Sequence, residues 1–218
     1  MITGLLDIII VRFNTPRLDK RCVSSVLDYV GYSPHIITIF DNSQDKYTVT
    51  QVWNKLIRKS MGEYILLLNN DAKLTKWAIP KMMDTLLSSK DIGAVGPSTN
   101  HSKNVQRLIR YPSTRSEIDM QKEYGDKWQL SGFCLLLRRW VYAMVSGFNE
   151  EYGHYGQENE LLYKIQKAGF RTMWRQDAFV HHVGQASSKN KKGFDDTKER
   201  DIAGERYKLL VTNNEESK

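Results

Sequence analysis

Side chains that can bind a metal stand at the end of one apolar segment in the middle of the chain. Residues 64–68 are apolar in a row, and Asn69, Asn70 and Asp71 follow directly. Such a run is typical of a strand buried on both faces of a parallel sheet, and ligands of open α/β sheets bind outside the carboxyl ends of strands. A carboxylate there is well placed to bind Mg²⁺ or Mn²⁺, which take oxygen ligands. Taken alone, the three residues fit a simple turn equally well.

Two further groups with suitable chemistry lie in the second half of the chain. Glu158 and Glu160 stand where a helix is predicted to begin. Their simplest explanation is structural, because acidic side chains stabilise a helix N-terminus; the same position would keep Glu158 ionised, as a general base requires. His181 and His182 follow a predicted strand at 178–180. An imidazole nitrogen suits Mn²⁺ better than Mg²⁺.

These groups need a scaffold, and the pattern of the chain predicts one. Strands are expected at residues 5–11, 36–40, 64–68, 92–95, 130–137, 171–174 and 178–180. Helices are expected at residues 16–31, 48–59, 78–88, 140–145, 157–168 and 197–211. Thr15 is expected to cap the first helix, Gly96 and Pro97 to end the fourth strand, and Gly169 to end the helix after Glu158. The alternation predicts a single α/β domain with a mainly parallel, doubly wound sheet.

Composition sets outer limits on partners and location. The chain has 218 residues, an ordinary apolar fraction of 40% and a formal net charge of +7, which favours an anionic partner. We expect no signal peptide and no membrane-spanning segment. Cys22 and Cys134 fall in a predicted helix and a predicted strand, so we expect no disulfide and a reducing compartment. The expected location is cytoplasmic, with peripheral contact at the inner membrane face as a variant.

The segment 98–128 has little periodicity. From residue 98 to 115 it carries Lys103, Arg107, Arg110 and Arg115 and no acidic residue. A long irregular segment inside a domain is typical of a functional loop. The segment is equally consistent with a loop that binds an acceptor substrate or a phosphate and with a plain solvated loop.

The order of the short motifs resembles a known family. The motifs are Phe13-Asn14, Asp41-Asn42-Ser43, Asn69-Asn70-Asp71, Ser131-Gly132, Gly147-Phe148-Asn149-Glu150, Gln157 to Leu161, Ala168-Gly169-Phe170 and Ala178 to Ser187. In this order they resemble the family-2 glycosyltransferases of the GT-A fold, especially the bacterial rhamnosyltransferase-like branch. The resemblance runs from about residue 7 to residue 187.

The resemblance implies a role for each matching position. Asp41 would contact the base of the donor nucleotide, and Asp71 would be the last carboxylate of the Asp-x-Asp motif and bind the metal. Asn69 takes the first position of that motif, so it brings no charge. Glu158 falls on the catalytic base position, where Asp is more usual. His182 falls on the family's histidine near the diphosphate and metal.

Further positions follow from the same resemblance. The donor-binding set is Phe13, Asn14, Asp41, Asn42, Asn69, Asn70, Ser131 and Gly132. Secondary candidates for metal, acid–base or phosphate contacts are Glu160, His181, Lys55, Arg58 and Lys189. Within the single domain 1–218, residues 1–97 would bind the nucleotide sugar, residues 98–187 would bind the acceptor and carry the base, and residues 188–218 would form a basic segment and a terminal helix.

The expected function is an inverting glycosyltransferase that depends on Mn²⁺ or Mg²⁺. It would transfer a sugar from a nucleotide-diphosphate donor to a hydroxyl of a glycan or lipid-linked glycan. A nucleotidyltransferase is disfavoured, because no glycine-rich phosphate loop follows the first strand. Two alternatives rest on charge: a glycosyltransferase acting on modified nucleic acid, as in a phage, and a non-enzymatic basic protein that binds nucleic acid.

Overall fold

The computed structural model describes residues 4–108, 115–125, 129–184, 186 and 195–215. Its strands are β1 (Leu6–Arg12), β2 (His35–Asp41), β3 (Tyr64–Asn69), β4 (Ala72–Leu74), β5 (Ile92–Thr99), β6 (Glu117–Asp119), β7 (Cys134–Arg138) and β8 (Arg171–His182). Its helices are α1 (Pro16–Tyr29), α2 (Val49–Lys59), α3 (Ala78–Ser88), α4 (Met120–Tyr124), α5 (Arg139–Met144), α6 (Gln157–Lys167) and α7 (Asp196–Glu215).

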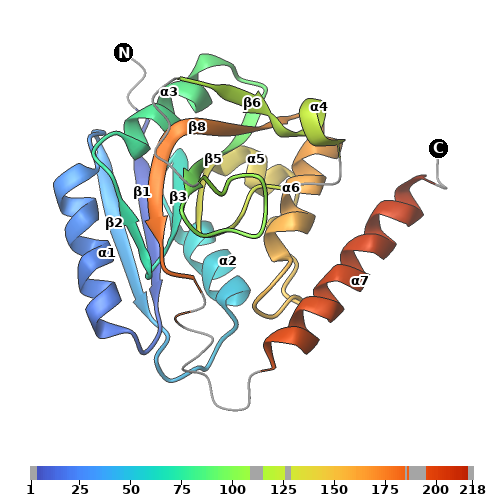
Figure 1. Ribbon diagram of the computed structural model, residues 1–218, viewed down its shortest axis with the longest axis horizontal. Coiled ribbons are helices and arrows are strands. Elements are labelled where there is room, and N and C mark those ends of the chain that lie inside the picture. Colours follow the sequence, from blue (N-terminus) through green and yellow to red (C-terminus); the bar gives the residue numbers. More distant parts are fainter. Residues whose placement is uncertain (1–3, 109–114, 126–128, 185, 187–194, 216–218) are drawn as a thin grey trace.

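All eight strands join one mixed sheet (Figure 1). Its order is β2-β1-β3-β7-β5-β8-β4, and β6 pairs with β8 beside this path. β1 is parallel to β2 and β3, and β5 is parallel to β8, whereas β7 is antiparallel to both β3 and β5. Hence β1, β2, β3, β5 and β8 run one way and β4, β6 and β7 the other. The predicted α/β architecture with a mainly parallel sheet is confirmed, and the carboxyl ends of β1, β2 and β3 share one edge.

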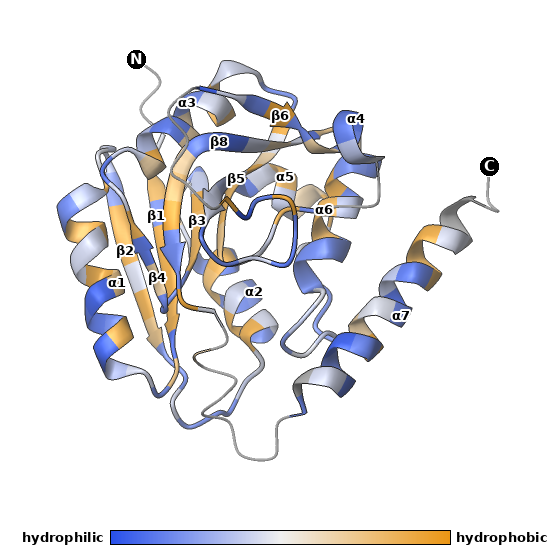
Figure 2. Ribbon diagram, in the orientation of Figure 1, coloured by the Kyte–Doolittle hydropathy of each residue, from blue (hydrophilic) through white to orange (hydrophobic). Residues whose placement is uncertain are grey.

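Helices cover both faces of this sheet. α1 and α3 pack on one face, where Leu66 and Leu68 of β3 point. α2, α5 and α6 pack on the other, where Ile65 and Leu67 point. This explains why residues 64–68 are apolar throughout, and Figure 2 shows the central strands as the most hydrophobic part of the chain. Each such side chain, fully buried, contributes about 1.5–3 kcal/mol.

Two strands differ in length from the sequence prediction. β5 does not end at Gly96 and Pro97 but continues to Thr99. β8 is one strand where two were predicted. Both differences have the same cause: Pro97 pairs with Arg175 and the next residue, Ser98, pairs with Phe179, so the extra residues of β8 bulge out at this point. A bulge accommodates a proline within a ladder and interrupts the apolar pattern without ending the strand. β4, β6 and α4 were not predicted.

Thr15 takes the N-cap position of α1, but its hydroxyl donates to Asp19 Oδ1 and does not cap the helix. Gly169 has a φ of +88° just after α6, as expected of a C′ glycine. Cys22 and Cys134 are free, buried thiols, and burial raises the pKa of Cys22 to about 12. Within the described ranges, no helix has the length and apolar character needed to span a bilayer.

Candidate active site at the carboxyl edge of the sheet

A buried hydrogen-bond network fixes the turn that carries Asp71. Asn70 is buried, and its Nδ2 atom donates to Thr15 Oγ1 at 2.6 Å and to Asp19 Oδ1 at 2.7 Å. Arg12, at the end of β1, donates from Nε to Asp19 Oδ2 at 3.1 Å. The network ties the β3–β4 turn to the start of α1. Asn70 therefore points toward the start of α1 and holds the turn. The next residue, Asp71, points toward β8 instead.

Asp71 meets His182 across two antiparallel strands. β4 pairs with β8 in a register that sets Ala72 opposite His182. Asp71 Oδ1 lies 3.2 Å from His182 Nε2, and Oδ2 accepts the backbone N–H of Gly184 at 3.0 Å. Burial pushes the pKa of Asp71 upward, but His182 and the backbone N–H groups of Gly184 and Ala186 outweigh it, so the net pKa is lowered. Asp71 is consequently ionised.

The orientation of the His182 ring is set by two contacts. Its Nδ1 lies 3.1 Å from the carbonyl oxygen of His101, and its ring stacks on Phe133 with centroids 4.8 Å apart and an interplanar angle of 18°. Because a carbonyl oxygen only accepts, Nδ1 carries the proton and Nε2 of the neutral ring is an acceptor. A protonated Nε2 donates to Asp71 Oδ1; in the neutral ring the two atoms are both acceptors, an arrangement that a bound cation stabilises.

This pair fits a divalent cation as a partial ligand set. Among the described residues, no group of three or more His, Cys, Asp or Glu side chains is arranged to hold a metal. Mg²⁺ and Mn²⁺ sites that act on phosphates commonly use one or two protein ligands and fill the remaining positions with waters and phosphate oxygens. Asp71 and His182 are compatible with such an open site.

Gly132 and Phe133 connect the Asp71–His182 pair to Glu158. While Phe133 stacks on His182, a Cβ built on Gly132 would lie 3.4 Å from Cδ of Glu158. The peptide is anchored by the backbone of Asn69, whose N–H donates to the Phe133 carbonyl at 2.8 Å. Two adjacent residues just before β7 thus contact both groups and bring them to the same edge of the sheet.

Glu158 stands in the first turn of α6 with a buried carboxylate. The residue as a whole is partly exposed, yet its Oε2 atom is buried and has no hydrogen-bond partner among the described residues. Burial raises its pKa, and this outweighs the lowering effects of its own N–H, the N–H of Gly132 and the positive charge of Arg200. The helix N-terminus was expected to dominate and hold the pKa low; burial dominates instead.

The exposed end of β2 carries the residues expected to bind the donor base. Asp41 is exposed, and the backbone N–H of Ser43, which donates to Oδ1 at 2.9 Å, lowers its pKa. Asn14 donates from Nδ2 to the Ser43 carbonyl at 3.2 Å. Asn42 is buried and donates to the Tyr47 carbonyl, and partly buried Phe13 precedes Asn14. Of these side chains, Asp41 and Asn14 are presented to solvent.

The other two donor candidates lie nearer the centre of the edge. Asn69 is partly exposed at the end of β3. Ser131 is partly exposed just before Gly132, and its backbone N–H donates to Gln106 Oε1 at 2.7 Å. Gln106, in the segment predicted to be irregular, is fully buried. This segment therefore supports the Ser131–Gly132 peptide directly.

Several secondary candidates have other contacts. Lys55 Nζ lies over the rings of Phe40 and Tyr47, at 5.8 and 5.2 Å from their centroids. Arg58 pairs with Glu150 at 3.5 Å.

Glu160 and His181 also lie apart from the Asp71–His182 pair. Glu160 accepts from Asn149 Nδ2 at 3.2 Å. His181 is exposed and, as the neighbour of His182 on a strand, points to the opposite face. Lys189 lies outside the described residues.

The sequence analysis assigned no role to three residues that shape the site. Phe133 adjoins the Ser131-Gly132 motif, so its position was a usable signal. His101 lies in the segment predicted to be irregular, and nothing marks it. Gly184 has a φ of +77°, and a Cβ built on it would lie 2.2 Å from the His101 ring. Only glycine allows the His101 ring and the Gly184 N–H to approach His182 and Asp71 together.

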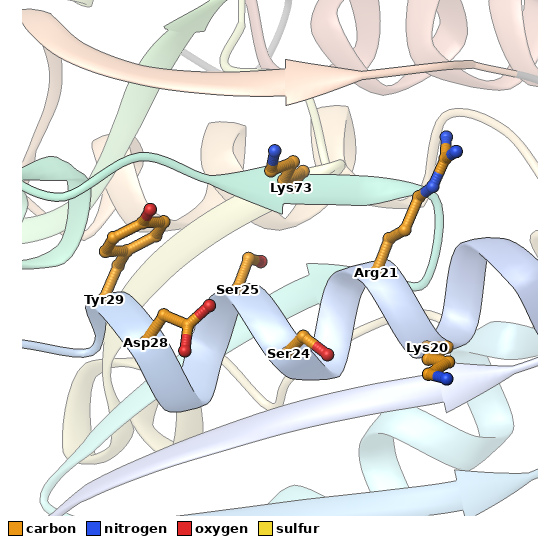
Figure 3. A pocket seen from close by; sticks show the side chains of 7 residues that line it. All are labelled: Lys20, Arg21, Ser24, Ser25, Asp28, Tyr29 and Lys73. Atoms are coloured by element: carbon orange, nitrogen blue, oxygen red, sulfur yellow. The ribbon is translucent and has the colours of Figure 1, made fainter.

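A separate cavity of about 300 Å³ lies between α1 and β4 (Figure 3). It is lined by Lys20, Arg21, Ser24, Ser25, Asp28, Tyr29 and Lys73. None of the side chains described above lines it, so it is distinct from the edge that carries Asp71 and Glu158.

Structural comparison finds this fold among solved glycosyltransferases. The mannosyltransferase PcManGT from Pyrobaculum calidifontis, in complex with GDP-Man and Mn²⁺, aligns with a TM-score of 0.63 and 14% identity over 88% of this chain and 59% of its own. GalNAc-T7, with UDP, GalNAc and Mn²⁺, aligns with a TM-score of 0.62 and 11% identity over 83% of this chain and 44% of its own. The chain thus spans less than two thirds of either protein.

No family model and no curated protein matches the chain. The structural likeness nevertheless defines its class: the chain has the GT-A fold of these glycosyltransferases.

Proposed function

We propose that this chain is an inverting, metal-dependent glycosyltransferase of the rhamnosyltransferase-like branch of family 2. One observation carries the proposal: a continuous set of contacts joins a cation-compatible pair to a buried carboxylate. Asp71 lies against His182, His182 stacks on Phe133, and the adjacent Gly132 lies against Glu158. A metal site for a leaving diphosphate and a base for an incoming hydroxyl need this proximity. Both structural neighbours have bound Mn²⁺ and a nucleotide or nucleotide sugar.

In this proposal the first half of the chain binds the donor. Asp71 and His182 would hold the cation, and the imidazole favours Mn²⁺ over Mg²⁺. When bound, the cation neutralises charge on the leaving diphosphate as a Lewis acid. Asp41, with Asn14 beside it, would contact the nucleotide base at the end of β2, within the donor-binding half 1–97. The neighbours carry GDP-Man in one case and UDP in the other, so the donor nucleotide stays open.

Glu158 would take the proton from the acceptor hydroxyl. Its pKa, raised by burial, is closer to neutral pH than that of an exposed Glu, which increases its strength as a base once ionised. A single base without a protein nucleophile gives one displacement, which inverts the anomeric centre. Gly132 leaves space beside the carboxylate where a side chain would stand.

The proposed acceptor is a hydroxyl of a glycan or lipid-linked glycan, bound by the half 98–187. The net charge of +7 keeps a nucleic-acid acceptor as a second candidate. Duplex DNA binding that weakens steeply with salt would favour the second candidate, and no binding at low salt would remove it. Two buried free thiols suit a reducing compartment, in keeping with a cytoplasmic enzyme.

A transfer assay tests the function. Purified protein is incubated with Mn²⁺, a panel of nucleotide sugars and candidate acceptors, and release of nucleoside diphosphate is measured. We expect release with one donor, dependent on metal, and lost in Glu158→Gln. Release that is equal without metal, or unchanged in Glu158→Gln, contradicts the proposed roles.

A further inference from the structure

The terminal helix α7 lies against the segment that leads into Glu158. In Figure 1 it runs beside α6 at the edge of the molecule. Ala203 is buried against Gly156, the N-cap of α6, and a Cβ built on Gly156 would lie 2.7 Å from that of Ala203. Arg206 Nη1 donates to the Glu151 carbonyl at 2.6 Å. The contact thus reaches to within two residues of Glu158.

The contacts of α7 come from one side of the helix. Glu199, Ala203 and Arg206 are spaced by four and three residues, which places them on one face. Glu199 lies against Gly153, where a Cβ would lie 2.3 Å from its Oε2 atom. The hydroxyl oxygen of Tyr207 accepts a hydrogen bond from Gln129 Nε2 at 3.1 Å. These contacts hold α7 against the segment that leads into α6.

Arg200 on the same helix is held in a defined position. Its guanidinium carbon lies 3.7 Å from the centroid of the Tyr155 ring, close enough for a stacked cation–π contact. Tyr155 precedes Glu158 by three residues. The charge of Arg200 acts on Glu158, whose Oε2 atom has no hydrogen-bond partner among the described residues.

We infer that α7 is a strap across the segment entering α6, and that Arg200, held on the ring of Tyr155, is a positioning residue that sets a positive charge at the start of α6, the turn that carries Glu158. The inference rests on the proposed function, because it concerns the base of that reaction. A buried carboxylate with one oxygen lacking a hydrogen-bond partner favours its neutral form, and a nearby fixed cation opposes this. Gly132, which also lies against Glu158, contributes an N–H and no charge.

The stack on Tyr155 gives Arg200 a role that lysine does not reproduce. A guanidinium is planar and lies flat on an aromatic ring, whereas an ammonium is a compact, flexibly held charge. Arg200→Lys therefore keeps the charge but loses its fixed position, and Arg200→Gln loses both. Arg206→Gln is the matched control, because Arg206 lies on the same helix, over the ring of Tyr152 in the same loop.

Carboxyl-carbon NMR of protein labelled at glutamate tests the inference without an activity assay. Glu158→Gln assigns the Glu158 signal, and its titration midpoint is compared among wild type, Arg200→Gln, Arg200→Lys and Arg206→Gln. We expect the midpoint to move to higher pH in Arg200→Gln, to move less in Arg200→Lys, and to stay in place in Arg206→Gln. Arg200→Lys supplies the answer if the glutamine variant does not fold.

A midpoint that stays in place in the Arg200 variants, or that moves equally in Arg206→Gln, overturns the inference. The titration is independent of transfer, so a wild type without transferase activity would reject the proposed function and leave this result standing. With an active wild type, the acid limb of the pH–rate profile should move to higher pH in Arg200→Gln by the same amount, since Glu158 must be ionised to act.

Discussion

Nε2 of His182 stands 3.2 Å from Oδ1 of Asp71, and further contacts fix the orientation of both side chains. Phe133 and the His101 carbonyl fix the imidazole, and the Gly184 N–H fixes the carboxylate. Such supporting contacts orient metal ligands and raise their affinity. The contacts hold the pair in place, and in the proposed site this would lower the cost of binding a cation and a diphosphate.

Asp71→Asn should remove metal-supported donor binding while the protein stays folded. The amide oxygen can still accept the Gly184 N–H, but the charge is lost. A ligand at 100 times its Kd stabilises by about 2.7 kcal/mol, and this gain should disappear in Mn²⁺. Thermal-shift measurements with and without Mn²⁺ check it, with the exposed Asp28→Asn as control. Donor affinity in Mn²⁺ equal to that of wild type would remove Asp71 from the metal site.

His182→Phe tests the nitrogen separately from the ring. Phenylalanine keeps the stack on Phe133 but supplies no ligand, so Mn²⁺ affinity should fall at least tenfold with little change in melting temperature. His181→Phe, on the opposite face of β8, should change affinity by less than twofold. Calorimetric titration of Mn²⁺ in the presence of the nucleotide measures both. Equal losses in the two variants would show that the effect is not local to His182.

Glu158→Gln should lose activity and gain stability. Burial raises the folded-state pKa above the unfolded value of 4.5, so stability falls as pH rises through this interval and ionised Glu158 is destabilising at neutral pH. Glutamine has no such dependence. We expect kcat to fall about 10²- to 10⁴-fold, donor binding to be unchanged, and the melting temperature to exceed that of wild type at pH 7.5 but not at pH 4.

The matched control for that change is Glu123→Gln, an exposed position on α4. It should alter neither turnover nor the pH dependence of melting. A Glu158→Gln protein that is less stable than wild type at pH 7.5 would contradict the buried, ionised state assigned to this carboxylate.

Gly184→Ala should damage the site through geometry alone. The residue has a φ of +77°, and its new Cβ would meet the His101 ring at 2.2 Å. We expect a loss of about 1–3 kcal/mol in unfolding free energy and weaker Mn²⁺ binding. Gly204→Ala, in α7 with nothing within 4 Å of its Cβ, should be neutral or stabilising by up to about 1 kcal/mol. Denaturant unfolding compares them; a Gly184→Ala protein as stable as Gly204→Ala would contradict the account.

Local patterns in the sequence predicted much of this fold. The apolar run at residues 64–68 identified β3, because a strand between two helical layers must be apolar on both sides. α3 lies at residues 78–88 as predicted, and Gly169 ends α6. Polar residues at strand ends indicated the edge where Asp71, Asp41 and His182 stand.

Contacts between distant segments were not predictable in this way. No local signal places β7 antiparallel between β3 and β5, and that placement is what brings Phe133 to His182. The pKa of Glu158 also depends on burial by distant segments, and its position at a helix N-terminus does not reveal that burial. Arg200 lies more than forty residues beyond Glu158, and only the packing of α7 brings the two together.

The most direct test of the central claim is a thermal-shift screen of UDP, GDP, dTDP, CDP and their sugars, with and without Mn²⁺. We expect that one nucleotide raises the melting temperature, that it does so only with the metal, and that Asp71→Asn abolishes the rise. A protein that none of these ligands stabilises, in the presence or absence of Mn²⁺, would contradict the assignment of Asp71 and His182 to a nucleotide-sugar site.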